Sequence, residues 1–344
     1  MSNHQWNEIE PKMLGMWQDA LSTMTDINNK CFSGKHQSCP SCGGQDRFRF
    51  DNNRYDKGDG GALCSQCGSG NGIYWLQKLT GWSFSDAVNA CGDFIGAVPP
   101  ERIAIAKKNV QLIPDNIYSA TASEIDISRI MARAIDFPTH IYPLEQGIAP
   151  EPLMVLNKEQ LNGKGEREVI DSRIVVQMIK IDEFPAEGKE PKGTPVNLVM
   201  IDKTGDLSFP VGKDEYHPNG KMAFGAVSVI GANTKKAIYL CADWADSWHV
   251  HHATGAQVWC CYTVSNLDKV AYYFYPECTE GRLRMACNYD FDELCEAEKR
   301  SCKVILPVGN KSIKEGRQFQ KVIFDPGALL DEMTSKMADK NKAP

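Results

Sequence analysis

The sequence predicts an α+β protein of several domains. It would have an N-terminal four-cysteine zinc ribbon with flanking helices, a mixed domain, and a C-terminal α/β domain. Three observations support this fold class. Two C-x-x-C pairs, at 39–42 and 64–67, have the spacing of a zinc ribbon. Strand-like and helix-like patterns alternate after Lys235, as in a parallel α/β sheet. The chain of 344 residues is long enough for two or three domains.

The first 30 residues are predicted to form an N-terminal helix, because apolar residues recur there at helical spacing. The zinc-ribbon domain follows at 31–96. We expect it to end in two helices, one from Ile73 to Leu79 and one from Trp82 to near Gly96.

Each cysteine pair is expected to lie on a tight turn that points two sulfurs at one ion. Gly43 and Gly44 after the first pair, and Gly68 after the second, supply the positive backbone torsions that such turns need. Four thiolates close a tetrahedral Zn²⁺ site and leave no open position for catalysis, so the ion would be structural. The expected ligands are Cys39, Cys42, Cys64 and Cys67. Disulfides or a redox pair are the alternatives, and the sequence favours zinc over both.

The remaining elements follow in chain order. A linker is expected at 97–122, a core subdomain at 123–234, an α/β domain at 235–333 and a disordered tail at 334–344. In the core subdomain we expect a helix at 125–134, strands at 168–182 and 196–210, and an exposed loop at 184–195. In the α/β domain we expect strands at 237–242, 257–262, 283–288 and 303–306, with helices at 245–253 and 291–301.

Composition excludes several classes of protein. The net charge is −6, so the chain as a whole is not a polycation that coats nucleic acid. No apolar run is long enough to span a membrane, and the polar start does not resemble a signal peptide. Thirteen cysteines, an odd number, suit a reducing compartment better than a disulfide framework. We therefore expect a cytoplasmic protein with no membrane partner.

The ribbon region is nevertheless mildly positive. Its cations are Lys35, Arg47, Arg49, Arg54, Lys57 and Lys78, and its anions are Asp46, Asp51, Asp56 and Asp59. Local sign matters more than net charge for a contact with nucleic acid.

One strand of the ribbon alternates charge with aromatic side chains. Arg47 and Arg49 should share one face, where they can contact phosphates, and Phe48 and Phe50 the other. The two phenylalanines either pack in the core or offer a platform for an unpaired base. Arg54 and Lys57 should belong to a flexible, glycine-rich hairpin tip, with Tyr55 and the glycines at 58, 60 and 61, that can touch nucleic acid.

Residues 30–96 resemble the zinc-binding domain of phage and plasmid primase-helicases, including those of the satellite-phage type. The resemblance rests on Cys39-Pro40-Ser41-Cys42-Gly43-Gly44, Arg47-Phe48-Arg49-Phe50, Cys64-Ser65-Gln66-Cys67-Gly68 and Gly81-Trp82-Ser83-Phe84. It implies a ribbon that reads single-stranded template and helps to place the initiating nucleotide, with the four cysteines as ligands. His36, beside the first pair, would hydrogen-bond a thiolate or replace a ligand.

The segment after Lys235 resembles, more weakly, the toprim domain of the same primases, with Ala253-Thr254-Gly255 as a shared phrase. The resemblance places Ala242 at the catalytic glutamate and Asn288 at the first aspartate of the Asp-x-Asp motif, so that only Asp290 keeps a carboxylate. Mg²⁺ or Mn²⁺ needs such oxygen ligands. This toprim domain is therefore expected to be degenerate and inactive.

A shifted acidic cluster is the alternative for catalysis. Its candidates are Asp243, Asp290 and Asp292, with Asp246 and Glu293 nearby. If it holds Mg²⁺ or Mn²⁺, the chain is an active primase that makes short RNA primers. Histidines 249, 251 and 252 and cysteines 260, 261 and 287 lack ligand spacing and are expected to be structural.

The sequence contains no Walker A motif. We therefore expect the family's helicase half to be absent and any replicative helicase to be a separately encoded partner. The leading hypothesis is a primase-like protein that binds single-stranded DNA in the replication of a phage, plasmid or integrative element. An active primase and a primase mimic that blocks replication are the alternatives.

Overall fold

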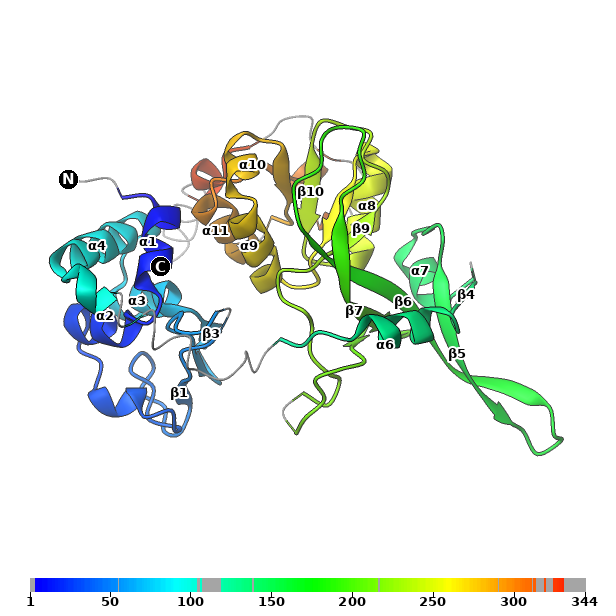
Figure 1. Cartoon of the computed structure of the whole chain (residues 1–344), viewed down its shortest axis with the longest axis horizontal. Helices are drawn as coiled ribbons and strands as arrows, with labels where there is room; N and C mark the ends of the chain where they lie inside the picture. Colours follow the sequence, from blue (N-terminus) through cyan, green and yellow to red (C-terminus); the bar gives the residue numbers. More distant parts are fainter. Residues whose placement is uncertain are drawn as a thin grey trace, which may run out of the picture. The chain divides into compact units, whose positions relative to one another are not determined.

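The computed structural model describes residues 4–54, 56–103, 106, 119–137, 139–215, 217–289, 291–310, 312–313, 319 and 324–330, without the side chains of 291, 292 and 310. The chain divides into two compact units, Met1–Tyr118 and Ser119–Pro344 (Figure 1). Each unit is described by itself. No helix among these residues has the length and apolar character needed to cross a membrane. The predicted tail at 334–344 lies outside the described residues.

The N-terminal segment forms two helices, α1 (Trp6–Met13) and α2 (Trp17–Met24), where one continuous helix was predicted. The break occurs at Gly15, whose φ of 79° no helical residue adopts. Its N–H donates to the carbonyl of Gly58 in the ribbon at 2.7 Å. The predicted apolar stripe still packs inward, because its members Ile9, Met13, Met16, Trp17 and Leu21 are at most 4% exposed.

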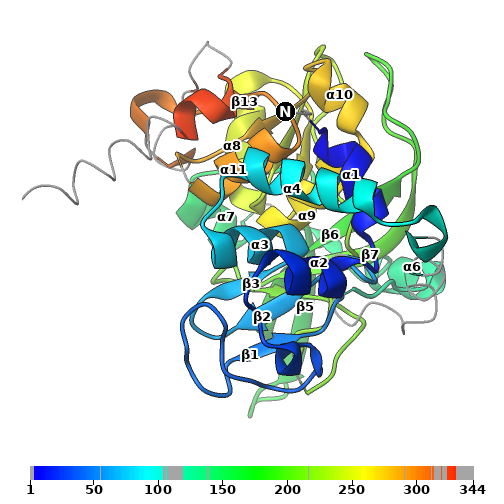
Figure 2. The same cartoon turned by 90° about the vertical axis from the view of Figure 1, so that its left-hand side faces the viewer.

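The ribbon is a three-stranded antiparallel sheet of β1 (Phe48–Phe50), β2 (Ala62–Cys64) and β3 (Gly68–Gly70), preceded by the 3₁₀ turn η1 (Asn29–Phe32). Helices α3 (Gly72–Thr80) and α4 (Phe84–Ala97) follow, close to the predicted positions. Figure 2 shows the helices gathered on one side of the strands.

Asn71 caps α3 and Ser83 caps α4, each accepting a backbone N–H with its side-chain oxygen. Trp75 of α3 is 1% exposed and meets Phe48 edge-on, with ring centroids 4.9 Å apart. The helices therefore supply the core that so small a sheet cannot build alone.

The second unit begins within the predicted linker. Ser119 and Ala122 already belong to it, since the N–H of Ala122 donates to the carbonyl of Val196 at 2.7 Å and the Ser119 hydroxyl accepts from Phe224. Residues 107–118 lie outside the described residues.

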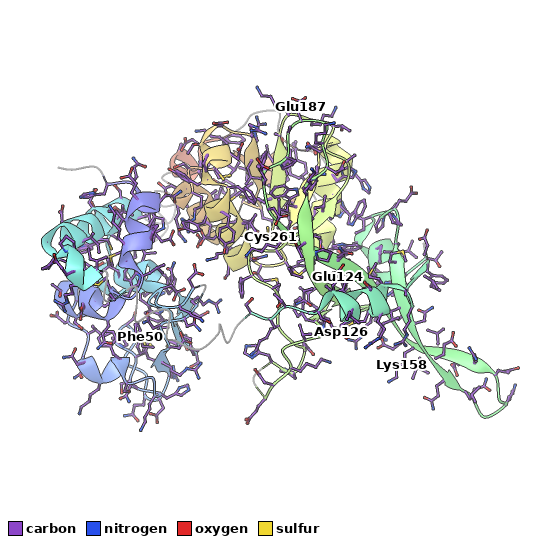
Figure 3. All side chains as sticks on the ribbon, in the orientation of Figure 1. Phe50, Glu124, Asp126, Lys158, Glu187 and Cys261 are labelled. Carbon is purple, nitrogen blue, oxygen red and sulfur yellow. The ribbon has the colours of Figure 1, made fainter. Side chains whose placement is uncertain are left out.

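An antiparallel sheet with strand order β4-β5-β6-β7-β8 forms the core subdomain. Its elements are α6 (Glu124–Met131), β4 (Ile135–Asp136), α7 (Ile141–Gln146), β5 (Met154–Leu161), β6 (Arg167–Ile181), β7 (Gly193–Ile201) and β8 (Leu207–Ser208). The predicted strand at 196–210 is broken by a turn in which the backbone N–H of Asp202 donates to the carbonyl of Asp206. Strand β5 escaped prediction because its outer half, around Lys158, is polar and belongs to a projecting hairpin (Figures 1 and 3).

The C-terminal sheet has the order β13-β12-β10-β11-β9, with four parallel strands as predicted and β9 antiparallel at one edge. Its strands are β9 (Ser228–Ile230), β10 (Ile238–Cys241), β11 (Val258–Cys260), β12 (Leu283–Ala286) and β13 (Val304–Ile305). Its helices are α8 (Trp244–Thr254), α9 (Val264–Tyr273), α10 (Tyr275–Thr279), α11 (Phe291–Lys299) and η2 (Val308–Asn310).

Helices α9 and α11 share a buried ion network. Asp268, 1% exposed, bonds Lys299 at 2.8 Å and also accepts from Arg300. Burial alone would raise the pKa of Asp268, but the two cations outweigh it and hold that pKa far below its usual range.

Candidate metal centre and nucleic-acid surface

The four predicted cysteine ligands converge on one point. The Sγ atoms of Cys39 and Cys67 are 3.8 Å apart, those of Cys42 and Cys64 are 3.9 Å apart, and all four lie within 4.8 Å of one another. A tetrahedron with Zn–S bonds of about 2.3 Å has edges of about 3.8 Å, so these separations fit one Zn²⁺ ion. A disulfide would need about 2.05 Å, so the sulfurs are not paired covalently.

Each pair is carried on a tight turn, with the predicted positive torsion at Gly43 and Gly68 but not at Gly44. In the first turn the N–H of Gly43 donates to the carbonyl of Cys39 at 2.8 Å, and Gly43 has a φ of 72°. In the second turn the N–H of Gln66 points at the sulfur of Cys64, 3.5 Å away, and Gly68 has a φ of 90°. These left-handed torsions let the chain reverse without a Cβ clash.

The backbone prepares the site for thiolates. Burial acts to raise the pKa of Cys64, but the N–H groups of Gln66 and Cys67 and the neighbouring thiols outweigh it and lower that pKa to about 7. Burial and the neighbouring thiols raise the pKa of Cys67 to about 12. A divalent cation resolves this conflict, because it favours the thiolate form of every ligand. Cysteine sulfurs in a closed set of four are the donor set of structural zinc.

His36 is not part of the cluster. Its Nδ1 lies 3.2 Å from the carbonyl of Asp46, and its side chain is exposed. Tyr74 supports the second turn instead, donating its hydroxyl to the carbonyl of Cys67 at 2.6 Å. Sequence reasoning missed this contact, which only the packing of α3 on the ribbon creates.

Strand β1 separates its side chains as the alternation predicts. Phe48 and Phe50 are 1% and 5% exposed, and Phe50 meets Phe32 edge-on at 4.9 Å (Figure 3). The core alternative therefore describes these two residues, and neither ring face is open to a base.

The opposite face of the ribbon carries the arginines. Arg49 stands in register with Leu63 of β2 and Ser69 of β3, so the three side chains form one row on the outer face. Arg47 is exposed, and its side chain lies against the Cα of Gly44 in the first cysteine turn. Leu63 and Ser69 were not predicted, although period-two alternation across the paired strands is the signal that finds them.

The glycine-rich loop after β1 is not a flexible tip, and that prediction was wrong. Gly58, Gly60 and Gly61 are buried. A Cβ on Gly60 would fall 2.5 Å from Cγ of Trp17, so glycine is needed there for close packing on α2. The Asp59 carboxylate ties the loop down, accepting the backbone N–H groups of residues 54, 56 and 61.

Arg54 and Lys57 are half-buried beside this loop. Tyr55 lies outside the described residues. The two cations remain candidate contacts, with less exposed surface than Arg47.

In a comparison with family models, residues 34–73 match the zinc-binding domain of primase-helicase. This segment resembles a primase-helicase zinc ribbon. The match contains all four cysteines and the strands β1 to β3, and it ends within the first turn of α3. It covers none of the second unit.

A second group of polar residues lies at the carboxyl ends of β10 and β12. Strand β10 lies between β11, which follows it in the chain, and β12, which comes after β11. The strand order therefore reverses between β10 and β12, and such topological switch points are where α/β proteins place ligands. Asn288 follows β12. Its N–H donates to Glu293 at 2.6 Å, its amide lies 3.5 Å from Asp246, and its side-chain oxygen accepts from Ile313.

The catalytic candidates are only partly visible at this edge. Asp243 is exposed and caps α8, accepting the N–H of Asp246 at 2.9 Å. Asp290 lies outside the described residues, as does the side chain of Asp292. Within the described part of the chain, the four cysteines are the one set of three or more ligand-type side chains close enough to share a metal ion.

Proposed function

We propose that this protein is a zinc-binding, primase-like protein that binds single-stranded DNA template during replication of a phage, plasmid or integrative element. One observation carries the proposal: the exposed Arg47 and the half-buried Arg49, whose guanidinium lies 3.7 Å from Asp51, stand on the outer face of a ribbon that resembles the zinc-binding domain of primase-helicases. The partners that it requires are single-stranded DNA and a separately encoded helicase in the cytoplasm.

The chemistry of the ribbon face suits a nucleic-acid backbone. Guanidinium groups bind phosphate oxygens with paired N–H donors, and the serine hydroxyl of the Arg49 row adds a further donor. The small side chains at the edge strand, Gly68 and Ser69, let a strand approach closely. The zinc holds this face rigid and does no chemistry, because its four ligands leave no open position.

The edge of the α/β sheet supports an inactive catalytic domain as part of this proposal. Alanine stands at 242, where a metal-binding carboxylate would be needed at the end of β10. Asn288 holds Asp246 and Glu293 through its own N–H groups. Those two carboxylates therefore satisfy an amide, as structural residues do.

An active primase is the second candidate, because Asp246 and Glu293 do gather at the switch point. Primer synthesis on single-stranded template with NTPs and Mg²⁺ or Mn²⁺ separates the two. The inactive domain yields no product. RNA primers that disappear in Asp290→Ala and Asp292→Ala would establish the second candidate instead.

Binding is tested by fluorescence anisotropy with a labelled single strand over a range of salt. The double variant Arg47→Ala/Arg49→Ala should bind more weakly and with a flatter salt dependence. Each lost phosphate contact removes about 0.7 from the log–log slope, so the double variant loses up to about 1.4. Lys203→Ala/Lys213→Ala, the same charge change at exposed sites of the second unit, is the matched control. Equal slopes in wild type and in the arginine variant would remove this face from the interface.

A further inference from the structure

A groove of about 440 Å³ opens beside the first cysteine turn. It lies between the carboxyl ends of α2 and α3, two helices in contact with each other. The groove is lined by Met24, Thr25, Asp26, Ile27, Pro40, Leu79, Thr80 and Trp82. Of these residues only Pro40 falls within the segment that matches the primase-helicase zinc-binding domain.

Trp82, which lines this groove, differs from the other tryptophans in its exposure to solvent. Its exposed fraction is 38%, whereas the other six tryptophans of the chain are at most 8% exposed. The local backbone holds it in place. Gly81 ends α3 with a φ of 73°, and the N–H of Trp82 donates to the Thr80 hydroxyl at 3.2 Å. An indole kept at the surface by its own turn is a preformed stacking platform.

The first cysteine turn links the groove to Arg47. Pro40 lines the groove, and Gly44, four residues later in the same cysteine turn, carries the side chain of Arg47 against it. A strand whose phosphates contact Arg47 therefore passes the rim of the groove. The bases of a single strand are unpaired and can turn into such a hollow.

We infer that this groove holds one unpaired base of the bound strand, stacked on Trp82. The inference rests on the proposed function, since the strand is the one held by the arginine face. Asp26 lines the same groove and accepts hydrogen bonds without donating any when ionised. Guanine fits best, because its N1–H and N2–H₂ groups offer two donors side by side to one carboxylate.

Because the other tryptophans are buried, a change in the solvent-exposed part of the tryptophan fluorescence reports on Trp82. Intrinsic fluorescence of the full chain is titrated with an oligothymidylate strand and with the same strand carrying one central guanine. Stacking on Trp82 should quench the exposed component of the emission, more strongly at equal concentration with the guanine strand. Trp82→Phe should abolish the quenching yet retain most of the affinity, because phenylalanine still stacks.

Trp82→Ala should weaken binding about 5- to 150-fold, the range for loss of one stacked base. Its salt slope should equal that of the wild type, since no phosphate contact is lost. Asp26→Asn should remove the preference for guanine. The residue is exposed and makes no cap, so this variant should fold normally.

The outcomes distinguish this inference from the function on which it rests. Binding that depends on Arg47 and Arg49, without quenching and with unchanged affinity in Trp82→Ala, overturns the groove and leaves the ribbon face. If DNA left the fluorescence of Trp82 unchanged and an apolar peptide quenched it, the groove would belong to a protein partner instead. No binding of single strands at any salt concentration overturns both.

Discussion

Replacing a single zinc ligand should unfold the ribbon. Structural zinc contributes about 10–16 kcal/mol at pH 7 in small zinc modules, whereas a whole domain is stable by about 5–15 kcal/mol. The ribbon strands are three residues each, too short to persist without the ion. Cys64→Ser replaces a thiolate that the backbone already favours with a hydroxyl that does not ionise. The loss of one ligand therefore removes a term as large as the stability of the unit.

The matched control is Cys91→Ser, which makes the same chemical change at a thiol that is 0% exposed in α4 and remote from the cluster in sequence. It should cost about 1–3 kcal/mol, the penalty of a buried hydroxyl without a partner, and keep the metal. Metal analysis should give one zinc per chain for wild type and for this control, and none for Cys64→Ser.

Tryptophan fluorescence and thermal unfolding report the fold in the same samples, because Trp6, Trp17 and Trp75 are buried in this unit. Cys64→Ser should show red-shifted emission and a missing unfolding transition. A Cys64→Ser protein that keeps one zinc, or that loses the zinc and keeps the wild-type transition, would refute the reasoning.

Two further predictions concern stability. Asp268→Ala should destabilise the second unit by about 3–5 kcal/mol, since it leaves the buried Arg300 without its carboxylate and leaves Lys299 with Glu296 alone; urea unfolding measures this, with the exposed Asp182→Ala as control. The folded pKa of Asp268 is depressed, so the ionised carboxylate stabilises the fold at pH values above its unfolded pKa of about 3.9. This stabilisation is lost as the pH falls below that value. The wild type should therefore lose stability in this acid range, and the variant should not lose this part of it. Gly72→Ala should cost about 1–3 kcal/mol by overpacking, because the new Cβ would fall 2.0 Å from the Trp17 ring. Gly96→Ala, with no atom within 4 Å, should cost nothing, and equal melting temperatures for the two variants would contradict the packing argument.

The ribbon was largely predictable because its determinants are local. The spacing of the cysteines and the glycines after them set two turns, and strand alternation placed Arg49 outside and Phe48 inside. The parallel sheet was also predictable, since strand and helix periods differ. Helices α9 and α10 were missed, although Leu267, Val270 and Ala271 of α9 recur at helical spacing.

The surroundings of the candidate sites depended on longer-range packing. The glycines at 58–61 looked like a mobile tip, and only their contact with Trp17 shows that they are close-packing residues. Asn288 looked like a lost ligand, and only the fold brings Asp246, 42 residues earlier, to its amide. Trp82 looked like the start of a helix, and its groove exists because α2 ends beside α3.

By itself, the sequence predicted the four cysteines of the metal centre, the two faces of β1 and the parallel strands of the C-terminal sheet. Each of these follows from a local pattern, because the regular backbone geometry of turns, strands and helices fixes how residues a few positions apart are arranged. The tertiary structure alone decided which glycines are buried, which groups the carboxylates near Asn288 bond and that a groove lies beside the first cysteine turn. These features depend on contacts between side chains that are far apart in the sequence. Hydrophobic burial drives those contacts, and because it is non-directional, a local sequence pattern does not specify which distant residues will pack together.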